Sequence, residues 1–357
     1  MVKYLVEKGA DVNLQTKDRS TPLHFACQGG SLAMIQYLVE KGADMNVQTI
    51  SGNAPFYFAC KSAQESNTVF DFMIINYLIE KGSDLSLVNS ADVSVYKVIN
   101  NAKPFSLRDN IFNLLRKILI SDIEKNNLSS LEKLYQVGQS LFQEPLHKKG
   151  FTAFHEIINQ KKVQLGQHFL NQNDIDPNTS DHHDRKLLHS AVYHHNDVAF
   201  DILLQKPSLE LNSKTRHSHH TPLTLAVSRG YHQGVEKLLK IPAVELTHKL
   251  KNGLTALAIA LKKGDLQMVK RLFEAYQKRG LTDQLSRYEM KKMLQLAHRQ
   301  KDTAFAKTIA TKYLEFYIEA NQKRSPNQYA NLPFFGYTST QKLEASQALK
   351  ASLESSK

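Results

Sequence analysis

The sequence contains few cysteines and no long apolar segment. Cys27 and Cys60 are its only cysteines, and they lie 33 residues apart. We expect both to be small buried side chains rather than a disulfide or a reactive pair, which fits a reducing compartment. No run approaches the roughly 18 apolar residues of a transmembrane helix, so no membrane span is expected. The N-terminus lacks a charged region followed by an apolar core, so we expect no secretory signal.

Motifs of catalysis are missing as well. The sequence has no GxSxG motif, no glycine-rich phosphate loop, no HExxH motif and no set of kinase motifs. We therefore predict that the chain is not an enzyme and uses no cofactor. Its formal net charge of +12 favours acidic partners but carries no information about the fold.

Residues 21–46, TPLHFACQGGSLAMIQYLVEKGADMN, form a unit that the chain repeats. Thr21-Pro22 is typical of a helix start, because the missing N–H of proline would have no partner in the first turn. The apolar residues that follow predict a short first helix. A second helix is predicted by apolar residues at helical spacing, namely Leu32, Ile35, Leu38 and Val39. Gly42 is expected to end it, since glycine enters the left-handed region easily.

The same residue pattern recurs at a fixed spacing. EKGAD at residues 7–11 recurs at residues 40–44, and residues 54–60 repeat the pattern of residues 21–27, in both cases 33 residues later. Such a period indicates a repeat architecture. The unit resembles the ankyrin repeat, whose TPLHxA signature is complete in residues 21–26. The resemblance implies stacked helix-turn-helix repeats that bind other proteins.

Further signatures at residues 152–155, 186–191, 221–226 and 255–260 extend the resemblance over about residues 1–276. We predict an all-α ankyrin-repeat solenoid of about eight helix-turn-helix repeats, two of them degenerate, with a C-terminal helical cap. The predicted segments are N-terminal repeats at 1–89, degenerate helical repeats at 90–146, C-terminal repeats at 147–280, the cap at 281–324 and a flexible tail at 325–357. Helices are expected at 105–120 and, in the cap, at 288–298 and 303–321.

Two local features accompany this division. Residues 1–13 align with residues 34–46, so the chain opens in the second helix of a repeat. We expect residues upstream of it and an exposed apolar edge. In the second full repeat, extra residues around 65–72 are expected to form a loop between its helices.

Histidines fall into two groups. His24, His155 and His189 occupy the signature position, where the resemblance implies a structural role between neighbouring repeats. Eight others lie within 51 residues: His182, His183, His194, His195, His217, His219, His220 and His232. Stacking would bring the connectors around His183 and His217 side by side, where neutral imidazoles could hold a metal. Because the spacing matches no zinc signature and no cysteine is near, we predict no metal and a solvated or partner-facing edge.

The resemblance implies that targets contact the connector tips and the exposed end of each first helix. Twenty such positions in the four later repeats include seven Lys or Arg, five His and no Asp or Glu. A groove lined by one sign of charge attracts the opposite sign. We predict that it binds an acidic protein segment, and that histidines there add charge as the pH falls toward about 6.5. The predicted partner-binding residues are Lys148, Lys149, His182, His183, Arg185, Tyr193, His194, His217, His220, Arg229, Lys251, Lys262 and Lys263.

Alternative functions stay open at this stage. The chain could be the targeting region of a larger enzyme whose catalytic domain lies outside it. It could instead bind nucleic acid through the cap, because residues 262–324 hold 15 Lys or Arg against 7 Asp or Glu. The sequence also looks similar to ankyrin proteins that intracellular bacteria inject into host cells, which implies a host-cytoplasmic location. Otherwise we expect a cytoplasmic monomer. The sequence names neither the partner nor the organism.

Overall fold

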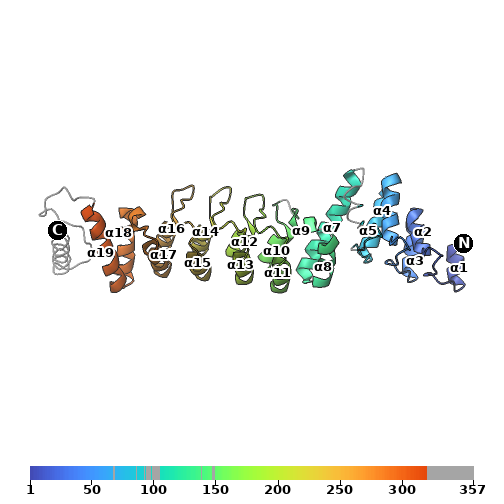
Figure 1. Ribbon diagram of the computed structural model, residues 1–357, viewed down its shortest axis with the longest axis horizontal. Helices are drawn as coiled ribbons and strands as arrows, with labels where there is room; N and C mark the ends of the chain where they lie inside the picture. The colour runs from blue at the N-terminus through green and yellow to red at the C-terminus, as the bar shows by residue number, and fades with distance from the viewer. Residues whose placement is uncertain are drawn as a thin grey trace. The chain divides into compact units, whose positions relative to one another are not determined.

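The computed structural model describes residues 1–66, 69–85, 87–91, 93, 98, 105–137, 139–146 and 149–319. Its helices belong to two compact units, formed by residues 1–182 with 201–205 and by residues 183–200 with 206–357. The first unit contains α1 (Val2–Glu7), α2 (Pro22–Gln28), α3 (Leu32–Glu40), α4 (Pro55–Ser66), α5 (Val69–Glu80), α7 (Phe105–Lys125), α8 (Leu128–Val137), α9 (Gln139–Gln143), α10 (Ala153–Asn159) and α11 (Val163–Leu170). The second contains α12 (Leu187–His194), α14 (Pro222–Arg229), α15 (His232–Leu239), α16 (Ala256–Lys263), α17 (Leu266–Lys278), η1 (Thr282–Gln284), α18 (Arg287–Arg299) and α19 (Thr303–Glu319) (Figure 1). Helix α13 (Asp197–Leu204) holds residues of both units.

Helix ends follow the repeated sequence signals. The Thr221 hydroxyl accepts a hydrogen bond from the Thr224 N–H at 3.3 Å and caps α14, whose first residue is a proline. Thr255 caps α16 in the same way, at 3.1 Å from the Ala258 N–H. Both helices end at a left-handed glycine, with φ 72° at Gly230 and 73° at Gly264. The predicted end of α3 is confirmed, because the helix ends at Glu40 and Gly42, one residue beyond its C-cap, has φ 88°.

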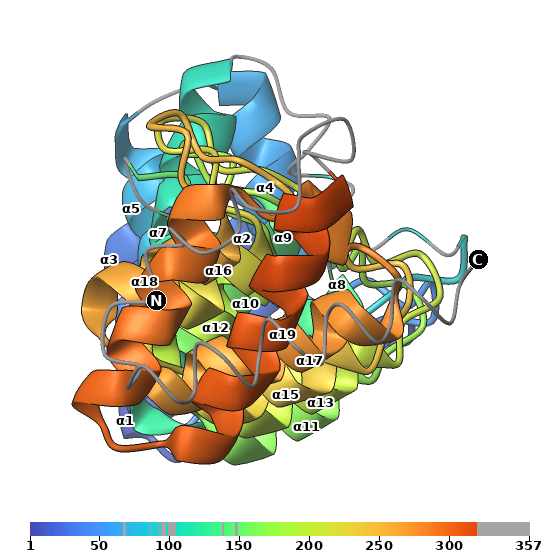
Figure 2. The same ribbon diagram turned by 90° about the vertical axis from the view of Figure 1, so that its left-hand side faces the viewer.

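Packing is repetitive within each unit. In the second unit α14 packs between α12 and α16, and α15 lies beside α17 (Figures 1 and 2). In the first unit α2 packs on α4, and α3 on α5. Apolar residues at helical spacing fill these contacts, and Leu38, Val235, Leu257 and Leu272 have no exposed surface. Burying each such side chain contributes about 1.5–3 kcal/mol, so every repeat is held mainly by its neighbours.

The long inserted segment of the second full repeat is helical. Helices α4 and α5 have 12 residues each, against 7 in α2 and 9 in α3. The predicted loop around residues 65–72 is therefore wrong for residues 65–66 and 69–72, while residues 67–68 lie outside the described part. Helix extension satisfies the backbone groups of added residues, which a loop would leave to other partners. The prediction of a long helix at 105–120 is confirmed by α7, which has 21 residues.

The two predicted cap helices are confirmed as α18 and α19. Met293 and Ile309 are fully buried, and the Phe305 ring meets Phe273 of α17 edge-on, with 5.8 Å between centroids. These contacts cover the last repeat, α16 and α17, with apolar side chains. The C-terminal end of the predicted cap, residues 320–324, and the predicted tail, 325–357, lie outside the described residues.

An apolar edge is exposed at α1, as predicted. Helix α1 contains no buried residue. Tyr4, Leu14 and Phe25 expose 62%, 68% and 55% of their surfaces. Together with α2 and α3, this edge surrounds a cavity of about 530 Å³ with mainly apolar walls.

Candidate protein-interaction surface

Three connector loops of the second unit run side by side. They comprise residues 183–186, 214–221 and 248–255, and they precede α12, α14 and α16. The second and third loops close on themselves, through the Thr215 N–H to the His220 carbonyl at 3.0 Å and the Leu250 N–H to the Leu254 carbonyl at 3.0 Å. Successive loops are also joined, since the Arg216 N–H donates to the His183 carbonyl at 2.9 Å. The loops therefore present one continuous surface within this unit.

Buried histidines form hydrogen bonds to the backbone of these loops. His189 Nδ1 accepts the Lys186 N–H at 3.2 Å, and its Nε2 lies 3.0 Å from the His220 carbonyl of the next repeat. In the first unit His24 bridges in the same way, with Nε2 3.2 Å from the Asn53 carbonyl. His155 is fully buried, and its Nδ1 lies 2.9 Å from the hydroxyl of Thr152, the N-cap residue of its own helix α10. The predicted structural role between neighbouring repeats is confirmed for His24 and His189, and His155 contacts the N-cap residue of its own helix.

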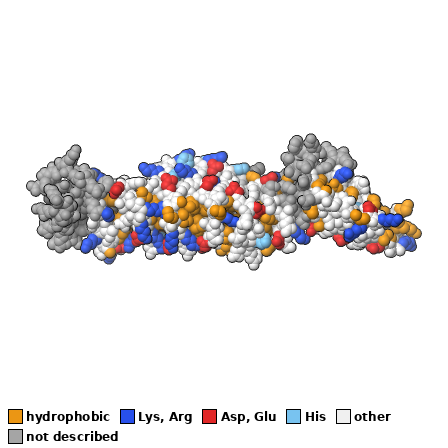
Figure 3. Space-filling view, in the orientation of Figure 1, with side chains coloured by type: hydrophobic (Ala, Val, Ile, Leu, Met, Phe, Trp, Pro, Cys, Tyr) orange, Lys and Arg blue, Asp and Glu red, His pale blue; other side chains and the backbone are white. Residues whose placement is uncertain are grey.

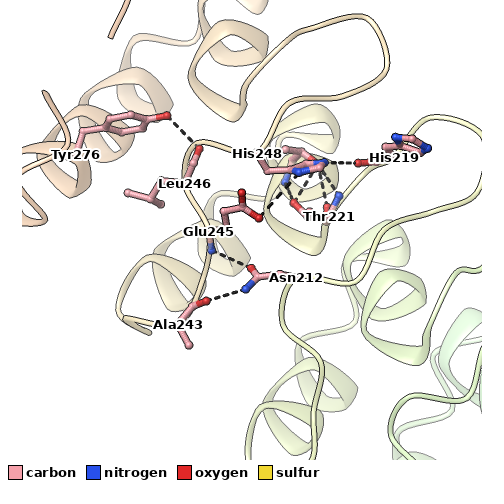
Figure 4. Close-up of polar contacts among 9 residues, drawn as sticks. Asn212, His219, Thr221, Ala243, Glu245, Leu246, His248 and Tyr276 are labelled. Atoms are coloured by element: carbon pink, nitrogen blue, oxygen red, sulfur yellow. Dashed lines mark hydrogen bonds and ion pairs between the residues drawn. The ribbon is translucent and has the colours of Figure 1, made fainter. Parts of the chain in front are cut away.

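His248 is a fourth histidine of this kind, and the sequence analysis missed it. Its side chain is buried, and Nε2 lies 2.8 Å from the His219 carbonyl (Figure 4). Nδ1 of the same ring faces the Glu245 carboxylate at 4.0 Å. His248 stands in the connector and outside the signature. A sequence signal for it would have been its place in the connector, seven residues before the helix-capping Thr255.

Asparagine and tyrosine side chains tie the bases of the loops together. The Asn212 amide oxygen accepts the Glu245 N–H at 2.8 Å, and its NH2 group donates to the Ala243 carbonyl at 2.7 Å (Figure 4). The Tyr276 hydroxyl of α17 donates to the Leu246 carbonyl at 3.0 Å. These contacts fix the base of the connector that leads to α16, which pre-organises its loop for binding.

Cationic side chains lie at the C-terminal ends of the first helices. The guanidinium carbon of Arg229, at the end of α14, lies 4.0 Å from the ring centroid of Tyr193 on α12. The Lys263 ammonium, at the end of α16, donates to the Ser228 carbonyl at 2.6 Å. Tyr193, Arg229, Lys262 and Lys263 are all exposed. These contacts connect three successive repeats.

The structure brings together some of the predicted binding residues and not others. In the second unit the His183 and His217 rings approach to 5.4 Å between centroids, as expected for adjacent connectors. Tyr193 contacts the ring of His194, Lys251 is exposed on the third loop, and Arg185 is half-buried. In the first unit the His182 N–H donates to the Lys149 carbonyl at 3.2 Å, and both side chains are exposed. Lys148 lies outside the described residues.

Carboxylates interrupt the cationic loop surface. Asp184 lies on the first loop, and its Oδ2 is 3.0 Å from Nε of Arg216 on the second. The Lys186 ammonium pairs with Glu210 at 2.6 Å. Figure 3 shows red side chains among the blue and pale blue ones over these loops. The twenty positions considered in the sequence do not include Asp184, so the loop surface is less uniformly basic than those positions indicate. The net positive charge lies at the helix ends, on Arg229, Lys262 and Lys263.

Burial lowers the pKa of three histidines, His24, His189 and His220. It lowers the pKa of His189 to about 4, against the weaker opposing effect of its hydrogen bonds to backbone carbonyls. Burial, followed by the charge of His248, also lowers the pKa of His220, whose Nδ1 lies 3.3 Å from the Thr224 hydroxyl. The expectation that His220 gains charge near pH 6.5 is therefore wrong, because its charging moves to more acidic solution.

Other kinds of site are absent from the described residues. Among them, no group of three or more His, Cys, Asp or Glu side chains could hold a metal ion. No helix within the described ranges is long and apolar enough to cross a membrane. Cys27 and Cys60 are buried free thiols, and burial raises the pKa of Cys27 to about 12, which leaves it unreactive.

Comparison with known proteins agrees with the repeat pattern. A family model described as ankyrin repeats (3 copies) matches residues 1–89 and 196–283. Alpha-latrotoxin-Lt1a of Latrodectus tredecimguttatus is 30% identical over 129 residues, which are 36% of this chain and 9% of the toxin. Alpha-latrotoxin-Lh1a of Latrodectus hasselti is 28% identical over 132 residues, again 36% of this chain and 9% of the toxin. The chain thus matches a small part of the length of these relatives.

Proposed function

Because this chain is an ankyrin-repeat protein, we propose that it is a non-enzymatic binding module that captures an acidic segment of another protein. Ankyrin repeats support a role in protein–protein interaction. The acidic partner and the surface that binds it are our proposal. The proposed surface is the loop and helix-end face of the second unit, centred on Arg229, Lys262 and Lys263.

One observation carries the proposal, namely the stacking of Arg229 on Tyr193 at 4.0 Å. A guanidinium held over an aromatic ring loses little further side-chain freedom when it pairs with a carboxylate. Its planar N–H groups can still bind a carboxylate with two parallel hydrogen bonds. An aromatic residue with an arginine is also a common composition of interface hot spots.

The surrounding charges favour the same kind of partner. Lys262 and Lys263 follow on the next first helix, and both are exposed. Single exposed ion pairs contribute only about 0.2–1 kcal/mol each. Affinity therefore requires several of them together, with Tyr193 supplying apolar contact area. Asp184, a carboxylate on the first loop, is paired with Arg216.

The test is a double charge reversal, Arg229→Glu with Lys262→Glu, compared with wild type in a pull-down read by mass spectrometry. A matched control, Lys240→Glu with Lys278→Glu, makes the same change of net charge directly after α15 and at the end of α17. We expect the first variant to lose the acidic partners that wild type and control retain. Unchanged capture by the first variant, with circular dichroism showing both variants folded, would exclude this surface.

Binding of nucleic acid by the cap has weaker support. The cap aromatic Phe305 is buried against Phe273, and so is unavailable to stack on bases. Lys270 and Arg271 of α17 pair with Asp302 and Glu236. A salt titration separates the two functions, because nucleic-acid affinity falls steeply with ionic strength. The host-cell location and the link to a larger enzyme remain predictions from the sequence.

A further inference from the structure

Helices α1, α2 and α3 surround an apolar cavity in the first unit. Its volume is about 530 Å³, and its walls include Leu5, Leu14 and Phe25. These three side chains expose 48%, 68% and 55% of their surfaces. The volume is typical of a binding pocket, and the exposed apolar walls favour an occupant that removes them from water.

The next repeat shows what covers the same position when a repeat is complete. Residues 1–13 align with residues 34–46, which makes Leu5 the counterpart of Leu38. Leu38 has no exposed surface, and the helix that carries it, α3, packs against α2. Leu5 is half exposed on α1. Helix α1 is therefore a second helix whose apolar side has the shape to receive a first helix.

The neighbouring side of α2 leads to the same conclusion. Phe25 corresponds to Phe58 of α4, 33 residues later. The Phe58 ring packs edge-on against the ring of His24 on the preceding first helix, with 5.6 Å between centroids. Phe25 has no such ring contact among the described residues, and more than half of its surface is exposed. Both α1 and α2 thus lack the same neighbour.

We propose that this face of α1 and α2 binds a short helix of a partner polypeptide that has the residue pattern of α2. That pattern is Thr-Pro-Leu-His, with the threonine as the N-cap residue. The bound helix would occupy the place that α2 occupies against α3 and α4. This binding site belongs to the first unit and does not depend on the acidic-segment function.

Helix α2 also indicates which side chains of the partner make the contacts. Leu23 is fully buried where α2 packs on α3 and α4. By the same packing, the leucine of the bound helix enters the cavity beside Leu5. The histidine of the bound helix meets the ring of Phe25, as His24 meets the ring of its own neighbour.

A backbone carbonyl is positioned to receive that histidine. Nε2 of His24 lies 3.2 Å from the Asn53 carbonyl, and the counterpart of Asn53 is Ser20. The Ser20 carbonyl accepts the Thr16 N–H at 2.9 Å, and the Asn53 carbonyl accepts the Thr49 N–H at 3.1 Å. The two turns therefore have the same internal hydrogen bond, and the Ser20 carbonyl can accept a second one from an imidazole.

Other occupants fit this face less well. A second copy of the chain could supply the helix only by removing its own α2 from α3 and α4, which would expose Leu23 and Leu38 in that copy. A lipid chain or another purely apolar molecule could fill the cavity. It would offer no hydrogen-bond donor to the Ser20 carbonyl, which lies at the polar end of the walls.

The experiment measures fluorescence anisotropy of a labelled peptide with the full chain. The peptide copies residues 18–30, with Cys27→Ser to remove the thiol. Free helices of this length are marginal in water, so the peptide is compared with its own variants. We expect Leu23→Asp in the peptide to weaken binding at least about tenfold, the loss for one buried leucine. His24→Ala in the peptide should weaken it about fivefold, the loss for one hydrogen bond.

Variants of the chain locate the site. Leu5→Asp and Phe25→Ser change exposed cavity walls, and Ile50→Ser is the matched control, at a residue of the same unit that is 68% exposed and outside the cavity. The first two should weaken the peptide at least about fivefold, and the control should bind as wild type does. In Phe25→Ser, the His24→Ala peptide should lose less than it does in wild type, because the ring contact is already absent. Circular dichroism checks that all three variants fold.

The possible outcomes decide between occupants. Equal binding of the peptide and its Leu23→Asp variant, or equal binding by wild type and Leu5→Asp, would overturn the proposal. Light scattering gives the mass of the chain with and without peptide. A monomer that takes up one peptide supports the proposed site, whereas a dimer that persists at saturating peptide would assign the face to a second copy. An apolar dye bound in the cavity should be released by the peptide, and binding of both together would place the peptide elsewhere.

Discussion

The Nε2 atom of His189 lies 3.0 Å from the carbonyl oxygen of His220, and so the signature histidine of one repeat holds the loop of the next. The ring is fully buried and neutral, since burial lowers its pKa to about 4. This contact couples the proton affinity of one side chain to the stability of two repeats.

Stability is predicted to fall in mild acid because of His189. Unfolded histidine titrates near pH 6.5, so between that pH and about 4 the unfolded chain binds a proton that the folded chain excludes. The contribution of His189 is thus fully present above pH 6.5 and is lost as the pH falls to about 4, by about 3 kcal/mol at most. Urea unfolding at pH 7.5, 6.0 and 5.0 measures it. His189→Gln should be less stable at pH 7.5 and show a shallower pH dependence, and an unchanged dependence would contradict the assignment.

Arg279 is predicted to be a strong stabilising residue outside the binding surface. Its guanidinium donates to the carbonyls of Leu239 at 3.0 Å, Ile241 at 2.8 Å and Pro242 at 3.3 Å, just where α15 ends. These carbonyls have no helical partner, and a charged donor is worth about 1.5–3 kcal/mol. We expect Arg279→Ala to lower stability by about 2 kcal/mol, and Arg279→Lys to recover only part of it because an ammonium lacks the planar fork. Thermal unfolding compares the two, with Gln277→Ala, at an exposed position near the end of α17, as the control.

Two helical glycines should respond oppositely to alanine. A Cβ at Gly234 of α15 would lie 2.2 Å from the ring of Tyr231, which is buried and packs edge-on against Phe200. We expect Gly234→Ala to destabilise by about 1–3 kcal/mol through overpacking. At Gly166 of α11 the nearest atom is 3.9 Å away, so Gly166→Ala should stabilise by about 0.5–1 kcal/mol through helix propensity. Equal shifts in the two melting temperatures would show that the ring of Tyr231 moves aside easily.

Asn212 is predicted to matter for the base of the third loop. Its amide satisfies one donor and one acceptor of the next repeat, the Glu245 N–H and the Ala243 carbonyl. Asn212→Ala should cost about 1–2 kcal/mol. Asn212→Asp retains the acceptor but sets a carboxylate against the Ala243 carbonyl, so it should be no better. Hydrogen exchange at the Glu245 amide reports the loss directly, and protection equal to wild type in Asn212→Ala would rule out this role.

Much of the fold was accessible from the sequence because each repeat carries its own start and stop signals. Thr221-Pro222 and Gly230 delimit α14 by local backbone chemistry alone. The same was true of α18 and α19, where helical spacing of Met290, Met293 and Phe305 marked the buried side. The wrong prediction for residues 65–66 and 69–72 has a physical cause, since an insertion without proline or glycine can lengthen helices as readily as a loop.

The candidate surface was less accessible. Sequence positions identified Arg229, Lys262 and Lys263 as end-of-helix cations. They could not show that Asp184 neutralises Arg216, because those residues lie 32 apart and meet only when loops pair. Nor could they separate His248, which is buried, from the exposed His217.

By itself the sequence determined the repeat: its period, its helix boundaries and the apolar faces, all of which depend on interactions within a few residues. Tertiary structure alone decided which cations are held by a ring or a carbonyl of the preceding repeat, which are cancelled by a carboxylate and which imidazoles are too buried to charge. These properties depend on distances between residues some thirty positions apart, and stacking sets those distances.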